Sequence, residues 1–351
     1  MSNVRSGLFF HPTGTASAGE VYENTLQLIQ EAESAGFHAA WVSQLHFQTF
    51  RGRLSSPFPF LVRAADRTRH IDLASGVATL PFENPLRLAE DAAVTNVLLR
   101  ERLSFGVGSG EPVAAEFEPF GVPFEERSER SRVNLLKLVQ ALRGEPLGAH
   151  GVELQPPAGK LAQRVWWASG SRERALWAAE AGVNLLINVD QARWDVPMVQ
   201  ANAESAAAFR AAWTRSHSPR VGVWRIVFPW DDPSTQLDAY WDITRAEAEV
   251  NLKRGLTKGA STLAELRARH QQTQLLTIGR PQQIVEQLRL EQERIGFTDF
   301  QFYFTFSGLD QQEKLRLLHR LADEVAGPLG WLRSSSSTAP RPSISDERAA
   351  L

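Results

Sequence analysis

The chain of 351 residues contains no cysteine. This absence excludes a disulfide framework, a thiolate nucleophile, a thiolate-bound zinc site and an iron–sulfur cluster. No apolar run approaches the roughly 20 residues that a membrane-spanning helix requires. Residues 1–5 lead into a strand-like segment without the apolar core of a signal peptide. We therefore expect a cytoplasmic protein that makes no contact with a membrane.

The charges are nearly balanced and are spread along the chain. The 38 Lys and Arg residues and the 40 Asp and Glu residues give a formal net charge of -2. A nucleic-acid-binding surface usually shows as a block of basic residues, and the basic residues here are scattered among acidic ones. Hydrophobic residues make up 43% of the sequence, which is enough to bury one large core.

Short strand-like runs alternate with helical patterns along most of the chain, which is typical of a parallel sheet with helical crossovers. One such pattern, 20–35, has apolar residues near helical spacing and ends at Gly36. Eight runs of this kind predict an α/β fold of the (β/α)8 TIM-barrel type. The expected strands are 6–11, 39–43, 71–80, 103–107, 165–168, 184–188, 221–228 and 298–306.

Two segments stand outside this alternation. A mostly helical insertion, 234–274, separates strands seven and eight, and Trp230, Tyr240 and Trp241 lie near its start. We expect it to cover the mouth of the barrel and to select the substrate, whose identity its helices do not reveal. Residues 1–333 are expected to form one barrel domain. The segment 334–351, rich in serine and proline, buries too little apolar surface to fold and is predicted to be a disordered tail.

Three of the strand-like runs end abruptly in small or polar residues, at 41–47, 76–81 and 105–110. A parallel barrel places its chemistry at such carboxyl ends. In this order and at these spacings the three endings resemble the bacterial luciferase-like family of flavin-dependent monooxygenases. The likeness covers roughly 7–329 and is also carried by the segments 84–85, 89–91, 118–121 and 278–281.

The resemblance implies a reaction and a set of partners. Reduced flavin mononucleotide (FMN), supplied by a separate flavin reductase, would bind at the mouth and react with O2, and one oxygen atom would enter a small organic substrate. The family also implies a homodimer formed through helices of the early half of the barrel. Two alternatives stay open: a deazaflavin (F420)-dependent oxidoreductase that transfers hydride, and a flavin-binding relative without catalysis.

His46 is the predicted catalytic residue. In the family, strand two commonly ends in Glu-His-His, whose first histidine is credited with acid–base work, whereas this chain has Gln44, Leu45 and His46. Leucine cannot transfer a proton, so His46 is the group left to do so; a purely structural histidine is the alternative. By the same resemblance, His11, Gln44 and Phe306 are expected to line the substrate pocket, although packing roles would explain them equally well.

The expected flavin-binding residues are Gly76, Gly108 and Ser109. The Gly108 loop does not open a helix, because Glu111-Pro112 follows it, so the dinucleotide fingerprint is excluded. The resemblance places this loop beside the flavin, where missing side chains would let the backbone approach the ring. It also places Gly76 and its neighbour where several members have a non-prolyl cis peptide, and it leaves that bond open here.

The phosphate of the cofactor is expected elsewhere than in the luciferases, because Ser109 stands where they have a phosphate-binding arginine. Ser171 matches a phosphate-contacting serine of the family, and Arg174 matches a hydroxyl residue there. Both open a predicted helix, whose first N–H groups attract anions. The alternative is an ordinary helix cap with solvated arginines. No His-x-His or paired acidic motif stands at a strand end, so we expect no metal site.

Overall fold

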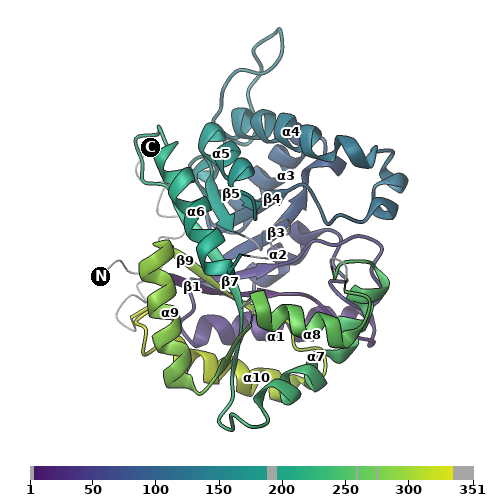
Figure 1. The fold of residues 1–351 in the computed structure, drawn as a ribbon. Coiled ribbons are helices and arrows are strands. Elements are labelled where there is room, and N and C mark those ends of the chain that lie inside the picture. Colours follow the sequence, from purple (N-terminus) through teal and green to yellow (C-terminus); the bar gives the residue numbers. More distant parts are fainter. Residues whose placement is uncertain (1–3, 188–195, 258–259, 274–275, 335–351) are drawn as a thin grey trace.

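Eight parallel strands close into a barrel in the computed structural model, which describes residues 4–187, 196–257, 260–273 and 276–334 (Figure 1). The ring closes because β1 pairs with both β2 and β9, and β7 pairs with both β6 and β9. The predicted TIM barrel is therefore confirmed. Its strands are β1 (Arg5–Phe10), β2 (Ala39–Val42), β3 (Asp72–Thr79), β4 (Leu103–Gly108), β5 (Val165–Ser169), β6 (Asn184–Ile187), β7 (Val221–Pro229) and β9 (Asp299–Phe304).

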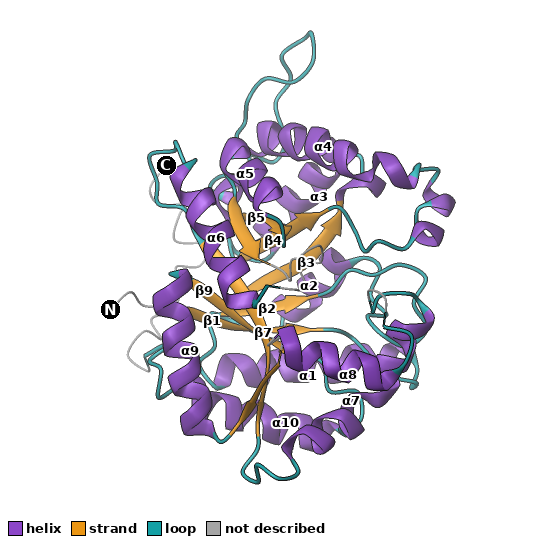
Figure 2. Ribbon diagram, viewed as in Figure 1, coloured by secondary structure: helices purple, strands orange, loops and turns teal. Residues whose placement is uncertain are grey.

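Helices surround the strands (Figure 2). Local signals fix several of their ends: Asn84 Oδ1 accepts from the first free N–H groups of α3, and Gly296 ends α9 in the left-handed conformation. The α-helices outside the insertion are α1 (Ala18–Ser34), α2 (Pro57–Ala65), α3 (Pro85–Leu98), α4 (Arg127–Leu142), α5 (Arg172–Ala181), α6 (Met198–Ala211), α9 (Pro281–Ile295) and α10 (Gln311–Arg320). A turn bridged at Leu147 and Val152 protrudes beyond α4 and α5.

The insertion between β7 and β9 contains more than the two helices α7 (Gln236–Lys253) and α8 (Leu263–Thr273). A further strand, β8 (Leu276–Gly279), pairs in parallel with the end of β7, from Ile226 to Pro229, and lies outside the closed ring. The insertion lies where the sequence predicted it, but β8 was not predicted. Four residues next to a Gly-Arg-Pro turn carry too short a pattern to identify a strand.

The barrel interior is filled by aromatic side chains. Trp41 and Trp166 meet edge to face with ring centroids 5.9 Å apart, and Phe9 stacks on Trp41. A Cβ atom at Gly76 would lie 2.6 Å from Phe9 Cε2, so only glycine fits above this layer. The peptide bond between Gly76 and Val77, which the sequence left open, is cis. A solid floor thus closes the barrel below its mouth.

The described chain ends on the opposite side of the barrel from the mouth. Trp331 packs against Phe297 and Phe300, and the N–H of Arg333 donates to the Gly36 carbonyl over 2.8 Å. Beyond residue 334, the predicted tail falls outside the described residues. Among the residues described, no helix combines the length and apolar character needed to cross a membrane.

Candidate functional site at the barrel mouth

His46 lies in the loop after β2 and is held in its neutral form. Gln44 Nε2 lies 3.2 Å from His46 Nε2, and an amide nitrogen can only donate, so His46 Nε2 accepts and its ring proton sits on Nδ1. The rings of Phe82 and Phe120 pack edge-on against the imidazole at 5.4 and 4.9 Å. Burial lowers the pKa of His46. The neutral imidazole therefore offers a proton for donation at Nδ1, while Gln44 occupies its accepting nitrogen.

A carboxyl group that the sequence analysis missed lies beside this pair. Glu83 Oε1, which follows the end of β3, lies 3.4 Å from the same Gln44 Nε2, and burial raises the pKa of Glu83. Gln44 stands where the family has an acid. Glu83 places a carboxyl group beside Gln44 from the end of another strand. No sequence pattern near Asn84-Pro85 identifies Glu83, because its connection to His46 runs through Gln44, which follows a different strand.

Buried polar atoms without partners lie at the ends of β1, β2 and β4. Among the described residues, none donates to or accepts from either ring nitrogen of His11, or the hydroxyls of Ser43 and Ser109. Burial, aided by Arg51, holds the pKa of His11 well below its usual range, so this ring is neutral as well. Buried polar groups are normally paired, and a row of unpaired ones suits a ligand that carries both donors and acceptors. A flavin ring, with its polar edge, fits that requirement.

Gly76 and Gly108, the glycines predicted to lie beside the flavin ring, are also required by the packing of the barrel. At Gly76 the space of a side chain is filled by Phe9 and Trp41, and at Gly108 a Cβ would meet Val77 Cγ2 at 3.0 Å. The packing of the barrel itself therefore explains why both positions are glycine. Their contact with a flavin stays a prediction.

Phe306 is packed among other aromatic side chains. It is only 2% exposed, and its ring packs against Phe228 and Phe304, which belong to the layer beneath the insertion. The expectation that it lines the pocket gains no support from this position. His11, by contrast, stands over the aromatic floor, 4.8 Å from the ring of Tyr303.

The amino-terminal ends of α4 and α5 meet at the edge of the mouth. Ser171 Oγ accepts from the N–H of Arg174 over 3.3 Å and caps α5, and Arg174 Nη2 donates to Ser128 Oγ over 2.7 Å. Arg127, the first residue of α4, lies over the ring of Phe124 at 3.9 Å. Ser171 and Arg174 are the residues that the sequence suggested for the phosphate, and that role stays a prediction. Arg127 and Ser128 were not predicted, because only the packing of α4 beside α5 brings them close to Arg174.

A buried ionic network ties the insertion to the mouth. Arg51 donates to Glu111 over 3.0 Å, to Glu247 on α7 over 3.1 Å and to the Tyr303 hydroxyl over 3.3 Å. Arg254 extends it to Glu111 and Glu116. Burial raises the pKa of Tyr303 to about 12, so this phenol stays protonated. The residues of this network lie far apart in the sequence, so no sequence motif identifies them.

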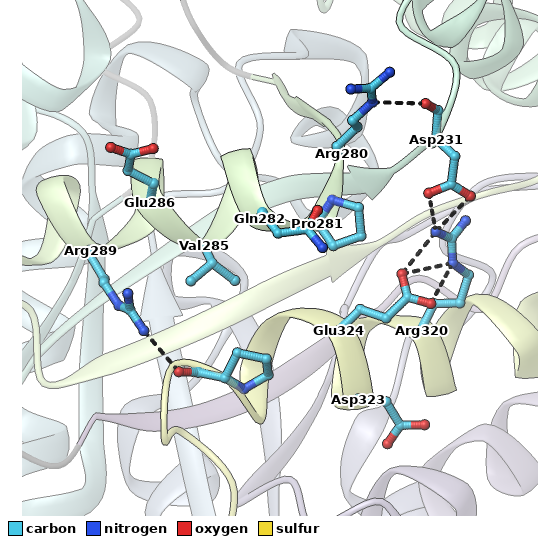
Figure 3. A pocket seen from close by; sticks show the side chains of 11 residues that line it. Asp231, Arg280, Pro281, Gln282, Val285, Glu286, Arg289, Arg320, Asp323 and Glu324 are labelled. Carbon is cyan, nitrogen blue, oxygen red and sulfur yellow. Dashed lines mark hydrogen bonds and ion pairs between the residues drawn. The ribbon is translucent and has the colours of Figure 1, made fainter.

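A separate hollow of about 1080 Å³ lies outside the barrel, between α9 and the segment that follows α10 (Figure 3). Arg320 pairs there with Asp231 and Glu324, and Arg280 donates to the Asp231 carbonyl. It shares no residue with the mouth. Among the residues described, no group of three or more His, Asp or Glu side chains is placed to hold a metal ion.

Comparison with known proteins agrees with this arrangement. The model of the family described as luciferase-like monooxygenase matches residues 5–299. An uncharacterized protein of Sinorhizobium fredii, y4vJ, is 24% identical over 88% of this chain and 92% of its own length. The oxygenase component of a flavin-dependent trigonelline monooxygenase from Acinetobacter baylyi is 32% identical over a stretch that covers 30% of each chain.

Solved structures share the fold at low identity. The oxygenating constituent of 3,6-diketocamphane monooxygenase from Pseudomonas putida, in complex with FMN, superposes with a TM-score of 0.73 at 18% identity, covering 93% of this chain and 98% of that one. A coenzyme F420-dependent tetrahydromethanopterin reductase from Methanopyrus kandleri gives a TM-score of 0.61, also at 18% identity, covering 93% and 99%.

Proposed function

This chain belongs to the luciferase-like monooxygenase family, and from that premise we propose that it is an FMN-dependent monooxygenase. Reduced FMN would come from a separate flavin reductase, and O2 would oxygenate a small organic substrate. The observation that carries the proposal is the set of buried, unpartnered polar atoms on His11, Ser43 and Ser109. It lies where a barrel of this kind binds its ligand, and a flavin supplies the missing donors and acceptors.

Different residues of the mouth have different roles in this proposal. The bound reduced flavin supplies the chemistry that activates O2. Ser109 and the strand ends beside it hold the ring, and Ser171 and Arg174 hold the phosphate. His46 holds a proton at Nδ1, while Gln44 fixes its tautomer. The rings of Phe82 and Phe120 keep water away from that imidazole.

Oxygen incorporation tests this function directly. The protein, FMN, a flavin reductase and NADH are supplied with ¹⁸O2 and a panel of small apolar and aromatic compounds. We expect at least one product that carries a single ¹⁸O atom, and its yield should fall about 100-fold or more in His46→Ala. If no product contains ¹⁸O, the proposal that this chain is a monooxygenase is wrong.

The same mixture with reduced F420 in place of FMN tests the hydride-transfer alternative. An F420-dependent reductase shares this fold, which is the reason to include the test. Reduction of a substrate by F420 without O2 would favour that alternative. Flavin binding with no product from either cofactor would favour a relative that has lost catalysis.

We further propose that two copies associate through α3 and α4. Apolar side chains are exposed on these neighbouring helices, with Leu98 56% and Val94 47% exposed on α3 and Leu136 42% exposed on α4. Exposed apolar groups gathered on adjacent helices are typical of a surface that a partner covers. The place agrees with the early-half helices through which the family forms homodimers.

A further inference from the structure

We propose that Glu83 is a positioning residue, which acts through Gln44 to keep the proton of the neutral His46 ring on Nδ1. The inference rests on the proposed function, in which His46 uses that proton. It gives a role to a carboxyl group that lies outside the strand-two motif. Because it concerns three side chains of the protein alone, it can be tested before any cofactor binds.

The amide of Gln44 lies between two acceptors. Its Nε2 atom is 3.2 Å from His46 Nε2 and 3.4 Å from Glu83 Oε1. An amide nitrogen carries two N–H groups, one for each of these acceptors. If the amide turned over, its carbonyl oxygen would face the Glu83 carboxylate, and two acceptors form no hydrogen bond. An ionised Glu83 therefore fixes the orientation of Gln44.

The orientation of Gln44 decides which nitrogen of His46 carries the proton. While the amide nitrogen faces the ring, His46 Nε2 accepts and the proton is on Nδ1. If the amide oxygen faced the ring instead, His46 Nε2 would donate and Nδ1 would have no proton. The proton that the proposed function requires thus depends on a carboxyl group at the end of another strand.

The turn that carries Glu83 is held from two sides. The Glu83 N–H donates to the Leu80 carbonyl over 3.2 Å, and Asn134 Nδ2, on α4, donates to the carbonyls of Leu80 and Glu83 over 2.9 and 3.1 Å. Phe82, in the same turn, packs its ring edge-on against His46 at 5.4 Å. One short turn therefore supplies both the apolar wall of the imidazole and the carboxyl group near it.

Glu83 has no cation beside it. Its side chain is half-buried and forms no ion pair within the described part of the chain, whereas Glu90 and Asp91 on α3 both pair with Arg87. Burial raises the pKa of Glu83, and the hydrogen bond from Gln44 opposes that rise. A half-buried carboxylate without a cation destabilises a fold. Its place beside the amide is therefore better explained by its effect on Gln44 than by stability.

NMR of the full chain without cofactor tests this role. At pH 8 the ring ¹⁵N shifts of His46 report the ratio of rings with the proton on Nδ1 to rings with it on Nε2, and His46→Gln assigns the signals. Glu83→Gln should lower this ratio about 2- to 10-fold, the effect of one hydrogen bond, because Gln44 can then turn over. Glu90→Gln removes a carboxylate that does not reach Gln44 and should leave the ratio unchanged.

Combined variants separate an action through Gln44 from any other effect of Glu83. Gln44→Leu should lower the ratio by a similar factor, and adding Glu83→Gln to it should change the ratio less than about twofold. Glu83→Asp, which keeps the charge but withdraws it, should give an intermediate ratio. An unchanged ratio in Glu83→Gln, an equal change in Glu90→Gln, or a full effect of Glu83→Gln in the Gln44→Leu protein overturns the role.

Turnover distinguishes a failure of this role from a failure of the proposed function. For a compound that the wild type oxygenates, Glu83→Gln should lower kcat about tenfold, less than His46→Ala does, and change KM less than about twofold. A wild type that oxygenates nothing, while the ratio responds to Glu83, overturns the proposed function and leaves the positioning role. A wild type that oxygenates a compound, while the ratio does not respond to Glu83, overturns the positioning role alone.

Discussion

Arg51 Nε donates to Glu247 Oε1 over 3.1 Å, and this one bond joins the loop after β2 to helix α7 of the insertion. The two side chains are 9% and 7% exposed, and Thr305, which follows β9, donates to the other oxygen of Glu247. Three parts of the chain therefore meet at a single buried ion pair. A buried ion pair, and not apolar packing alone, therefore holds the insertion against the loop after β2.

Removing Arg51 should destabilise the protein strongly. Arg51→Met leaves Glu247 buried without its cation, whereas Glu111 keeps Arg254. Breaking a buried pair in this way costs about 3–5 kcal/mol. Urea unfolding measures the loss. Arg51→Met combined with Glu247→Leu should recover part of it, because fewer charges stay unpaired. Arg245→Met, which breaks the exposed pair with Asp242, should cost less than about 1 kcal/mol; an equal loss in both single variants would contradict the account.

His46 should titrate below its usual value near 6.5, because burial disfavours the charged ring. Gln44→Leu removes a hydrogen bond to the neutral imidazole. Such a bond contributes about 0.5–1.5 kcal/mol, so the pKa of His46 should rise by up to about one unit in this variant. Proton NMR of the imidazole, with His46→Gln to assign the signal, measures both values. A wild-type pKa above 6.5, or a fall in Gln44→Leu, would show that the ring is not held neutral by these groups.

His38, on the opposite side of the barrel from the mouth, should make the fold sensitive to acid. Burial lowers its pKa to about 4, so between pH 6.5 and 4 the unfolded chain binds this proton and the folded chain does not. Stability must then fall as pH falls through that window, by about 1.4 kcal/mol per pH unit for one group. His38→Gln should reduce the slope of unfolding free energy against pH by about that amount. Parallel curves for the two proteins would rule this out.

The oligomer should depend on the apolar face of α3. In analytical ultracentrifugation, we expect the wild type to sediment as a dimer and Leu98→Lys to shift it toward the monomer, because a charge on the covered face must be desolvated. Leu290→Lys, on α9, provides the control, since Leu290 is 60% exposed on a different face. A monomeric wild type would contradict the dimer.

The sequence predicted those features that repeat or lie close together in the chain. Strand–helix alternation produced the barrel, and Ser171 was correctly recognised as the residue that opens α5. Glu83, Arg127 and the Arg51 network were missed for one physical reason. Each gains its role from a neighbour on another strand or helix, as when Arg51 meets Glu247 at a distance of 196 residues, and a single sequence carries no record of such pairs.

Residues that look functional in sequence can also have packing roles. Gly76 and Gly108 suggested an opening for a flat ring, and the space of their side chains is filled by neighbouring protein atoms. Phe306 suggested a pocket wall, and its ring packs against Phe228 and Phe304; its contact with a substrate stays a prediction. Distinguishing the two kinds of role requires knowledge of what lies opposite each residue.

Binding of the reduced cofactor tests the central claim most directly. Equilibrium dialysis of the purified protein against FMN and F420, each oxidised in air and reduced under anaerobic conditions, compares four affinities in one preparation. A monooxygenase that receives its flavin from a separate reductase should bind reduced FMN at one molecule per chain, more tightly than oxidised FMN and more tightly than either form of F420. Equal affinity for the two redox states of FMN, or tighter binding of F420, would contradict the account.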